Sequence, residues 1–257
     1  MKQQRLIPVA ARPRGVGLVE LMIGLTAGLL LLGALSYLFL GARQLNRTTD
    51  DVSRMQESGR IALEIMGRPI RQAGARSDVT AAFGGGTVNA LDPVEGASGA
   101  PDSLTVRYDV LDGGAANSGE VDCVGTTVAA GARITHIFAI GTTTDDPPIP
   151  ALTCTTPAGV AAGNAPVVVM DNIEDMQITY GIDATKDGTI DGVYQPAPVA
   201  NPSQVAAVRV SLLVRGPTSN VATNARTYTY NGASKDSADG FLRQVYTSTF
   251  TVRNQAK

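Results

Sequence analysis

One acidic residue, Glu20, lies within an otherwise uncharged apolar stretch that runs from Val16 to Leu40. A carboxylate inside an apolar span costs roughly 2.5–3.5 kcal/mol even on the most lenient insertion scale. A charge at such a position is therefore a candidate functional group that needs a partner.

The only two cysteines, Cys123 and Cys154, form the second candidate group. No CxxC motif and no Cys/His cluster accompanies them in the sequence, which argues against a zinc site. In an exported protein such a pair is expected to form one disulfide, and two free buried thiols are the alternative. Closing a loop of about 31 residues would stabilise the domain by roughly 3–4 kcal/mol.

The segment 183–192 carries aspartates at a spacing that partly matches a calcium loop. The expected side-chain ligands are Asp183, Asp187 and Asp191. Two residues depart from the calcium-loop pattern: Lys186 places a positive charge within the loop, and the twelfth position is Tyr194 instead of the usual glutamate. The Asp-Gly pair also favours a plain hairpin turn, which is the alternative interpretation. A bound calcium ion would stiffen this loop, and no cofactor is expected to be required.

The only histidine, His136, lies in a strand-like Thr-His-Ile-Phe run. No serine or cysteine nucleophile motif, glycine-rich phosphate loop or glycosidase-like acid pair stands out in the chain. We therefore interpret His136 as a packed strand residue instead of a catalytic base, and we expect that the protein is not an enzyme.

The elements that position these groups begin with a helix over the apolar stretch. At 1.5 Å per residue it would be about 37 Å long, enough to cross a bilayer. Lys2, Arg5, Arg12 and Arg14 precede it, and this places its N-terminal end on the cytoplasmic side. A cleaved secretory signal fits poorly, because the residues where the apolar region ends (37–42) include large side chains instead of the small ones that a cleavage site needs. A plain membrane anchor leaves Glu20 unexplained.

The residues Arg14-Gly15-Val16-Gly17-Leu18-Val19-Glu20 resemble the processing motif of prepilins. The resemblance implies cleavage between Gly15 and Val16 by a prepilin peptidase, with methylation of the new amino terminus at Val16. The family usually has Phe where this chain has Val16. The free ammonium of Val16 and the carboxylate of Glu20 would lie four residues apart, one helical turn. In the family the glutamate is thought to meet the amino terminus of a neighbouring subunit during assembly.

The helix is expected to continue through the polar segment 41–68, which contains no proline. Three ion pairs are expected at turn spacing: Arg47 with Asp51, Asp50 with Arg54, and Arg60 with Glu64. A narrow apolar stripe is predicted to face a domain; it consists of Val52, Met55, Gly59, Ala62, Ile65 and Met66. Pro69 should end or kink the helix at Arg68.

Residues 55–74, MQESGRIALEIMGRPIRQAG, resemble a segment of PilW-family minor pilins of the type IV pilus. Pro69 replaces an acidic residue that is usual there. The resemblance implies a type IV pilin-like α+β fold, with a long N-terminal α-helix packed on an antiparallel β-sheet domain.

The rest of the chain is predicted to be a loop-rich β domain, because Gly and Pro are frequent and aromatics make up only 5%. Residues 75–103 are expected to be a loop. Strands are expected at Leu104–Val110, Arg133–Ile140, Pro166–Met170, Met176–Ile182, Val205–Arg215, Thr227–Tyr230 and Gln244–Arg253. The predicted organisation is a cleaved leader (1–15), a transmembrane and assembly helix (16–40), an amphipathic helix half (41–74) and a globular domain (75–257).

The resemblance implies a minor pilin that promotes initiation and assembly of type IV pili, on which twitching motility and cell adhesion depend. Its partners would be other minor and major pilins, the prepilin peptidase, and the inner membrane before assembly. It would reside in the inner membrane with a periplasmic domain, and then in the pilus on the cell surface. Residues 1–15 contain four basic and no acidic residues, which leaves 17 basic against 23 acidic residues in the rest of the chain. This acidic body argues against non-specific nucleic-acid binding, so no nucleic-acid partner is predicted.

Two alternatives remain. A minor pseudopilin of a type II secretion system would assemble by the same physics but serve protein export. A membrane-anchored periplasmic binding domain or enzyme would keep an uncleaved N-terminus and contain a pocket lined by convergent polar groups.

Overall fold

The structure is a computed structural model that describes residues 17–75, 91–94, 101–110, 120–221 and 226–254. The predicted leader, Gly15 and Val16 therefore lie outside the described residues. The chain divides into two compact units, Met1–Arg47 and Thr48–Lys257, so the division falls within the first helix. The second unit contains the helix from Thr48 onward and all of the strands that the structure describes.

Helix α1 extends from Leu18 to Gln72 and contains Pro69. Of the two outcomes predicted for Pro69, an end of the helix at Arg68 is therefore wrong, and a kink stays a prediction. Proline lacks the N–H group for one helical hydrogen bond, but the added residues bury Pro69 and Ile70 in the core. A residue outside the helix caps its C-terminal end: the Asn254 side-chain amide donates hydrogen bonds to the carbonyl oxygens of Gln72 and Ala73 at 3.2 and 3.3 Å.

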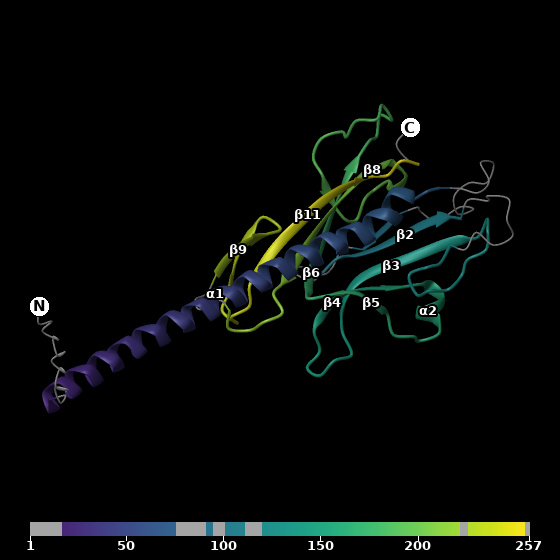
Figure 1. The fold of residues 1–257 in the computed structure, drawn as a ribbon. Coiled ribbons are helices and arrows are strands. Elements are labelled where there is room, and N and C mark those ends of the chain that lie inside the picture. Colours follow the sequence, from purple (N-terminus) through teal and green to yellow (C-terminus); the bar gives the residue numbers. More distant parts are fainter. Residues whose placement is uncertain (1–16, 76–90, 95–100, 111–119, 222–225, 255–257) are drawn as a thin grey trace, which may run out of the picture. The chain divides into compact units, whose positions relative to one another are not determined.

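The strands form two main antiparallel sheets and one hairpin (Figure 1). The five-stranded sheet has the order β1 (Leu91–Val94), β2 (Ser103–Asp109), β3 (Arg133–Thr142), β4 (Pro150–Thr155), β5 (Val167–Asp171). The four-stranded sheet has the order β11 (Arg243–Thr251), β8 (Val205–Arg215), β6 (Ile173–Ile182), β7 (Gln195–Pro196). The hairpin pairs β10 (Ala233–Ser237) with β9 (Arg226–Tyr230). A short helix α2 (Pro157–Ala161) and a 3-10 turn (Pro202–Gln204) complete the described elements.

The predicted α+β class with a long N-terminal helix and antiparallel sheets is thus confirmed. Strand β8 has the predicted bounds, and the other six predicted strands are found with one or both ends shifted by one to three residues. Strands β1, β4, β7 and β10 were not predicted. Strand β1 lies within the segment that was expected to be only a loop.

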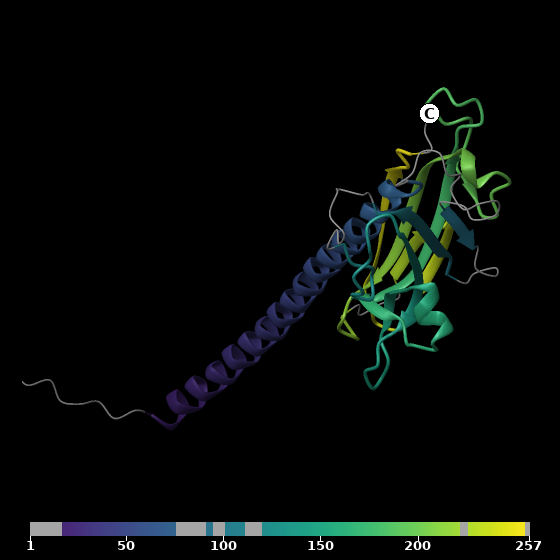
Figure 2. The same ribbon diagram turned by 90° about the vertical axis from the view of Figure 1, so that its right-hand side faces the viewer.

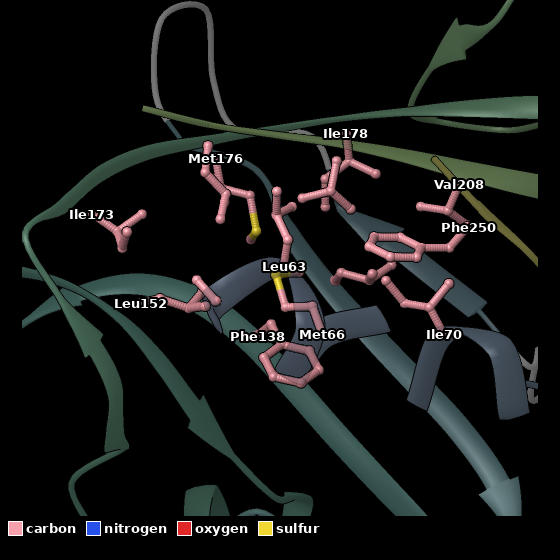
Figure 3. Close-up of a cluster of buried hydrophobic side chains, with 14 of the residues drawn as sticks. Leu63, Met66, Ile70, Phe138, Leu152, Ile173, Met176, Ile178, Val208 and Phe250 are labelled. Atoms are coloured by element: carbon pink, nitrogen blue, oxygen red, sulfur yellow. The ribbon is translucent and has the colours of Figure 1, made fainter. Parts of the chain in front are cut away.

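The second half of α1 packs against strands of both main sheets, and Figure 2 shows this arrangement from the side. Figure 3 shows Leu63, Met66 and Ile70 of the helix among side chains from the two sheets. The four-stranded sheet contributes Met176, Ile178, Val208 and Phe250, while the five-stranded sheet contributes Phe138 and Leu152. One continuous core therefore joins the helix to both sheets. Fully burying such side chains contributes about 1.5–3 kcal/mol each.

Four positions of the predicted apolar stripe are buried, namely Met55, Gly59, Ala62 and Met66. Ile65, however, is 39% exposed, whereas Leu63 is buried. Two sheets flank the helix, so the buried face is wider than the narrow stripe that the spacing indicated.

Two helix glycines, Gly59 and Gly67, are buried where β11 approaches the helix. A Cβ atom added at Gly59 would lie 2.5 Å from the Tyr246 ring, and one added at Gly67 would lie 2.5 Å from the Phe250 ring. The absence of a side chain at both positions lets the aromatic rings of β11 pack directly on the helix backbone.

Asp51 is a buried carboxylate at the start of this packed half, with an exposed fraction of 2%. It accepts a hydrogen bond from the Thr218 hydroxyl at 2.9 Å and one from the Thr218 backbone N–H at 3.3 Å. Thr218 follows β8, so Asp51 fixes the helix to the far end of that strand. Of the predicted ion pairs, Arg60–Glu64 is observed at 3.8 Å between exposed side chains.

Candidate functional site

The first half of α1 is a candidate assembly surface. Its large apolar side chains between Leu18 and Leu40 are all exposed, with fractions of 57–80%. The helix is long and apolar enough to cross a membrane by length and composition. Gly24, Gly28 and Gly33 have no atom within 4 Å of an added Cβ, so no contact among the described residues explains them. This half therefore offers an apolar surface that has to be covered by lipid or by other chains.

Glu20 lies in the first turn of α1 and is exposed on this surface. The positive end of the helix dipole favours an acidic side chain in that turn, typically by 0.3–1 kcal/mol. This offsets only part of the cost of placing a carboxylate in hydrocarbon. The predicted cleavage and methylation positions, Gly15 and Val16, lie outside the described residues, so the proposed pairing with Glu20 stays a prediction.

The disulfide prediction is confirmed, since Cys123 and Cys154 are joined with their Cα atoms 6.1 Å apart. Cys154 is fully buried in β4, where it pairs with Phe138 of β3. Cys123 comes from the segment before β3, in which Asp122 accepts hydrogen bonds from the backbone N–H groups of Val124 and Thr126 at 3.0 and 2.8 Å. The bond therefore fastens a loop to a central part of the five-stranded sheet.

His136 lies beside this disulfide. It is 6% exposed and lies between the rings of Tyr108 and Phe138, as expected for a packed strand histidine. Its Nε2 atom is 3.2 Å from the Tyr108 hydroxyl, and its Nδ1 atom is 3.9 Å from Cys154 Sγ. The sequence did not predict that His136 lies next to Cys154, because the two residues are far apart in the chain and only the pairing of β3 with β4 brings them together.

Burial dominates the protonation of this cluster. It lowers the pKa of His136, an effect that the nearby Asp122 carboxylate partly opposes. Burial also raises the pKa of Tyr108 to about 12, with a further contribution from Glu120 and an opposing one from Arg68. A neutral imidazole beside a neutral phenol is therefore the favoured state near pH 7.

A pocket of about 550 Å³ opens next to the disulfide and His136. Its polar lining includes Arg68 and Gln72 of α1, Glu120 and Asp122 of the loop, and Tyr108 of β2. No residue was predicted to line a pocket. The lining comes from five separate segments (α1, β2, residues 120–123, β3 and β5), so only their packing in the core brings these groups together.

The aspartate-rich loop forms the turn between β6 and β7, as in the alternative interpretation of that sequence. Asp183 is buried and accepts from the N–H groups of Asp187 and Gly188 at 3.2 and 2.9 Å. Asp191 accepts from the N–H groups of Ala184 and Thr185 at 2.7 and 3.1 Å. Backbone donors thus occupy these carboxylates in the structure, and calcium binding stays a prediction.

The long helix with an exposed apolar first half, joined to antiparallel sheets that cover its second half, is the arrangement that the resemblance to pilins implies. The family model PilW, the type IV pilus-assembly protein W, matches residues 137–254. These residues extend from β3 to just beyond β11, whereas the sequence resemblance noted above lies at residues 55–74. The predicted resemblance to PilW is thus confirmed on a separate part of the chain, and it supports a pilin related to the type IV pilus.

A solved structure with a similar fold is a type IV-like pilin from Thermus thermophilus. It covers 82% of this chain and 99% of its own, with a TM-score of 0.45 and 16% sequence identity. No curated protein sequence matches the chain significantly.

Proposed function

We propose that this protein is a minor pilin that promotes the initiation and assembly of type IV pili. The PilW match over residues 137–254 carries the proposal. The exposed apolar half of α1 adds support, because a subunit needs such a helix to reside in the inner membrane and then to pack in the helical centre of a filament. Pilus-dependent adhesion and twitching motility would follow from this role.

The proposal assigns processing to Gly15 and Val16 and assembly to Glu20. A prepilin peptidase would cut between Gly15 and Val16 and methylate Val16. The exposed Glu20 carboxylate would then meet the amino terminus of a neighbouring subunit, so each charge would be neutralised as it enters an apolar environment.

The partners would be other minor and major pilins, contacted by the apolar helix and by free sheet edges. Strand β5 ends the five-stranded sheet, and its sequence Val-Val-Val-Met-Asp contains neither lysine nor proline. Val167 and Val168 are 42% and 40% exposed. The opposite edge strand, β1, contains Pro93, which has no N–H group to donate and so discourages strand addition. Edge β5 is thus the better of the two for contact with another pilin.

The decisive experiment is to delete the gene in the native host and to complement it with the wild type, Glu20→Ala or Glu57→Ala. Glu57 is an exposed glutamate in the second half of α1 and serves as a matched control. We expect surface pili to be lost on deletion, and to be restored by the wild type and Glu57→Ala but not by Glu20→Ala. Immunoblots of membranes and sheared pili then show whether the variant accumulates in the membrane without entering the filament.

Intact-mass analysis of the protein from host membranes tests the processing step. A mature chain that begins at Val16, with or without a methyl group, is expected. A chain that begins at Met1 would contradict the filament proposal. Normal pili combined with loss of protein export in the deletion strain would instead assign the protein to a type II secretion system as a minor pseudopilin.

A further inference from the structure

Three side chains with metal-binding atoms converge next to the pocket. Cys123 Sγ, Cys154 Sγ and one ring nitrogen of His136 all lie within 4.8 Å of one another. They come from the loop before β3, from β4 and from β3. Within the part of the chain that the structure describes, no other group of three or more cysteine, histidine or acidic residues meets this condition.

The chemistry of this group fits a zinc ion. Two thiolates and one imidazole are ligands that Zn²⁺ binds well, and a site with three protein ligands leaves a fourth position for water. The Nδ1 atom of His136 faces Cys154, while Nε2 lies 3.2 Å from the Tyr108 hydroxyl. A histidine that binds metal through one nitrogen commonly donates the other N–H to a partner that fixes the ring. Tyr108 is placed to be that partner.

In the disulfide form the two sulfurs are bonded to each other and provide no thiolate. We propose that reduction of the Cys123–Cys154 disulfide creates a zinc site formed by Cys123, Cys154 and His136. A dithiol reductant supplies two electrons and two protons, becomes a disulfide itself, and leaves two thiols on this chain. Binding of Zn²⁺ then displaces the two thiol protons.

The site needs only a local rearrangement. Tetrahedral geometry with Zn–S distances of about 2.3 Å places the two sulfurs about 3.8 Å apart. Cys154 is fully buried in β4, but Cys123 is half-buried in a loop and lines the pocket of about 550 Å³. Cys123 can therefore move toward the pocket, which also provides a path for the ion and space for a water ligand.

The loop at Cys123 could therefore be linked to the sheet either by the disulfide or by a zinc ion. The disulfide fastens the loop at Cys123 to β4 in the oxidised chain, and the metal would fasten the same loop to β4 and β3 in the reduced chain. The disulfide and the metal exclude each other, so occupancy of the site would report the redox state of the protein.

The test uses the full-length protein in detergent micelles, reduced with a phosphine and kept free of oxygen. Co²⁺ is titrated first, because a tetrahedral site with thiolate ligands gives characteristic visible and charge-transfer absorption, and Zn²⁺ is then added to displace it. We expect one equivalent to bind to the reduced wild type and none to the oxidised protein. The variant Cys123→Ser/Cys154→Ser should show no thiolate band.

His136→Asn should weaken Co²⁺ binding by at least about tenfold, and Tyr108→Phe should weaken it less. Circular dichroism checks that the sheets persist in each variant. An intact reduced protein without thiolate–cobalt absorption would overturn the proposal, as would equal affinity in His136→Asn. If reduction alone unfolds the sheets, Zn²⁺ must restore the spectrum of the oxidised protein, and failure to do so would also overturn it.

Discussion

The two halves of α1 have opposite relations to the rest of the chain. Between Leu18 and Leu40 the large apolar side chains are exposed, whereas in the second half Met66 and Ile70 have no exposed surface. Glycines follow the same division, since Gly33 has open space around it and Gly67 touches an aromatic ring. One helix thus has an exposed apolar surface in its first half and a face buried in this chain's own core in its second half.

The acidic residues differ in the same way. Glu20 is exposed in the apolar half, and Asp51 is buried in the packed half with both of its carboxylate oxygens bonded to Thr218. Thr218 supplies the hydrogen-bond donors of Asp51, so this carboxylate has a structural role. Glu20 has no such donor among the described residues, and we predict that it acts in assembly and not in stability.

The largest effect is expected for a core truncation in the packed half. Ile70→Ala should lower the free energy of unfolding by about 2–5 kcal/mol, because it leaves a cavity between the helix and both sheets. Leu30→Ala, in the exposed half, should leave the unfolding of the sheets unchanged. Urea denaturation in detergent, followed by circular dichroism, measures both variants. Equal losses would show that the two halves do not differ in this way.

A glycine substitution should give a smaller effect of the same kind. Gly67→Ala forces the Phe250 ring to move and should cost about 1–3 kcal/mol. The matched control is Gly41→Ala, where an added Cβ meets no atom within 4 Å and alanine favours the helix. Thermal unfolding compares the two. If Phe250→Leu reduces the cost of Gly67→Ala in a double-mutant cycle, the ring contact is its cause.

The two acidic residues should separate stability from assembly. Asp51→Ala removes the acceptor of two Thr218 hydrogen bonds and should cost about 1–3 kcal/mol in unfolding free energy. Glu20→Ala should leave that free energy unchanged while it prevents incorporation into pili. Denaturation and immunoblots of sheared pili provide the two measurements, and a stability loss in Glu20→Ala would contradict the division.

The smallest effect concerns pH. Because burial lowers the pKa of folded His136 below its unfolded value of about 6.5, the unfolded chain binds more protons in the interval between the two values. The free energy of unfolding therefore has its full value above about pH 6.5, and it decreases as the pH falls from there toward the pKa of folded His136. Burial raises the pKa of Asp175, which acts in the opposite direction. The difference between wild type and His136→Asn in melting temperature from pH 7.5 to 5 therefore isolates the histidine. A constant difference would contradict this assignment.

Local patterns predicted much of the fold. The apolar run and the helix-compatible residues after it predicted α1, and the nearly alternating residues 205–215 predicted β8. Strand β4 was missed because its last five residues are all buried and show no alternation. The helix end was wrong because burial of Pro69 and Ile70 outweighs one lost hydrogen bond.

The candidate sites divide in the same manner. The disulfide could be predicted from the two cysteines and their context, and the role of Glu20 stays a prediction of the same kind. The pocket and the place of His136 could not, because they depend on the register in which Phe138 pairs with Cys154. Asp51 was expected in an ion pair with Arg47. Its role as acceptor for Thr218 depends on where the chain turns after β8, which no local pattern encodes.

The contacts of Gly59 and Gly67 with β11 also have a mechanical consequence. Eight residues of helix advance about 12 Å, and the four residues from Tyr246 to Phe250 advance about 13–14 Å along a strand. The two rings therefore fit two gaps in the helix surface at nearly the same spacing. A pull along the helix axis would have to shear both rings out of their gaps together. We expect tension on α1 to be shared between the two contacts and passed to β11 instead of being concentrated at the end of the helix.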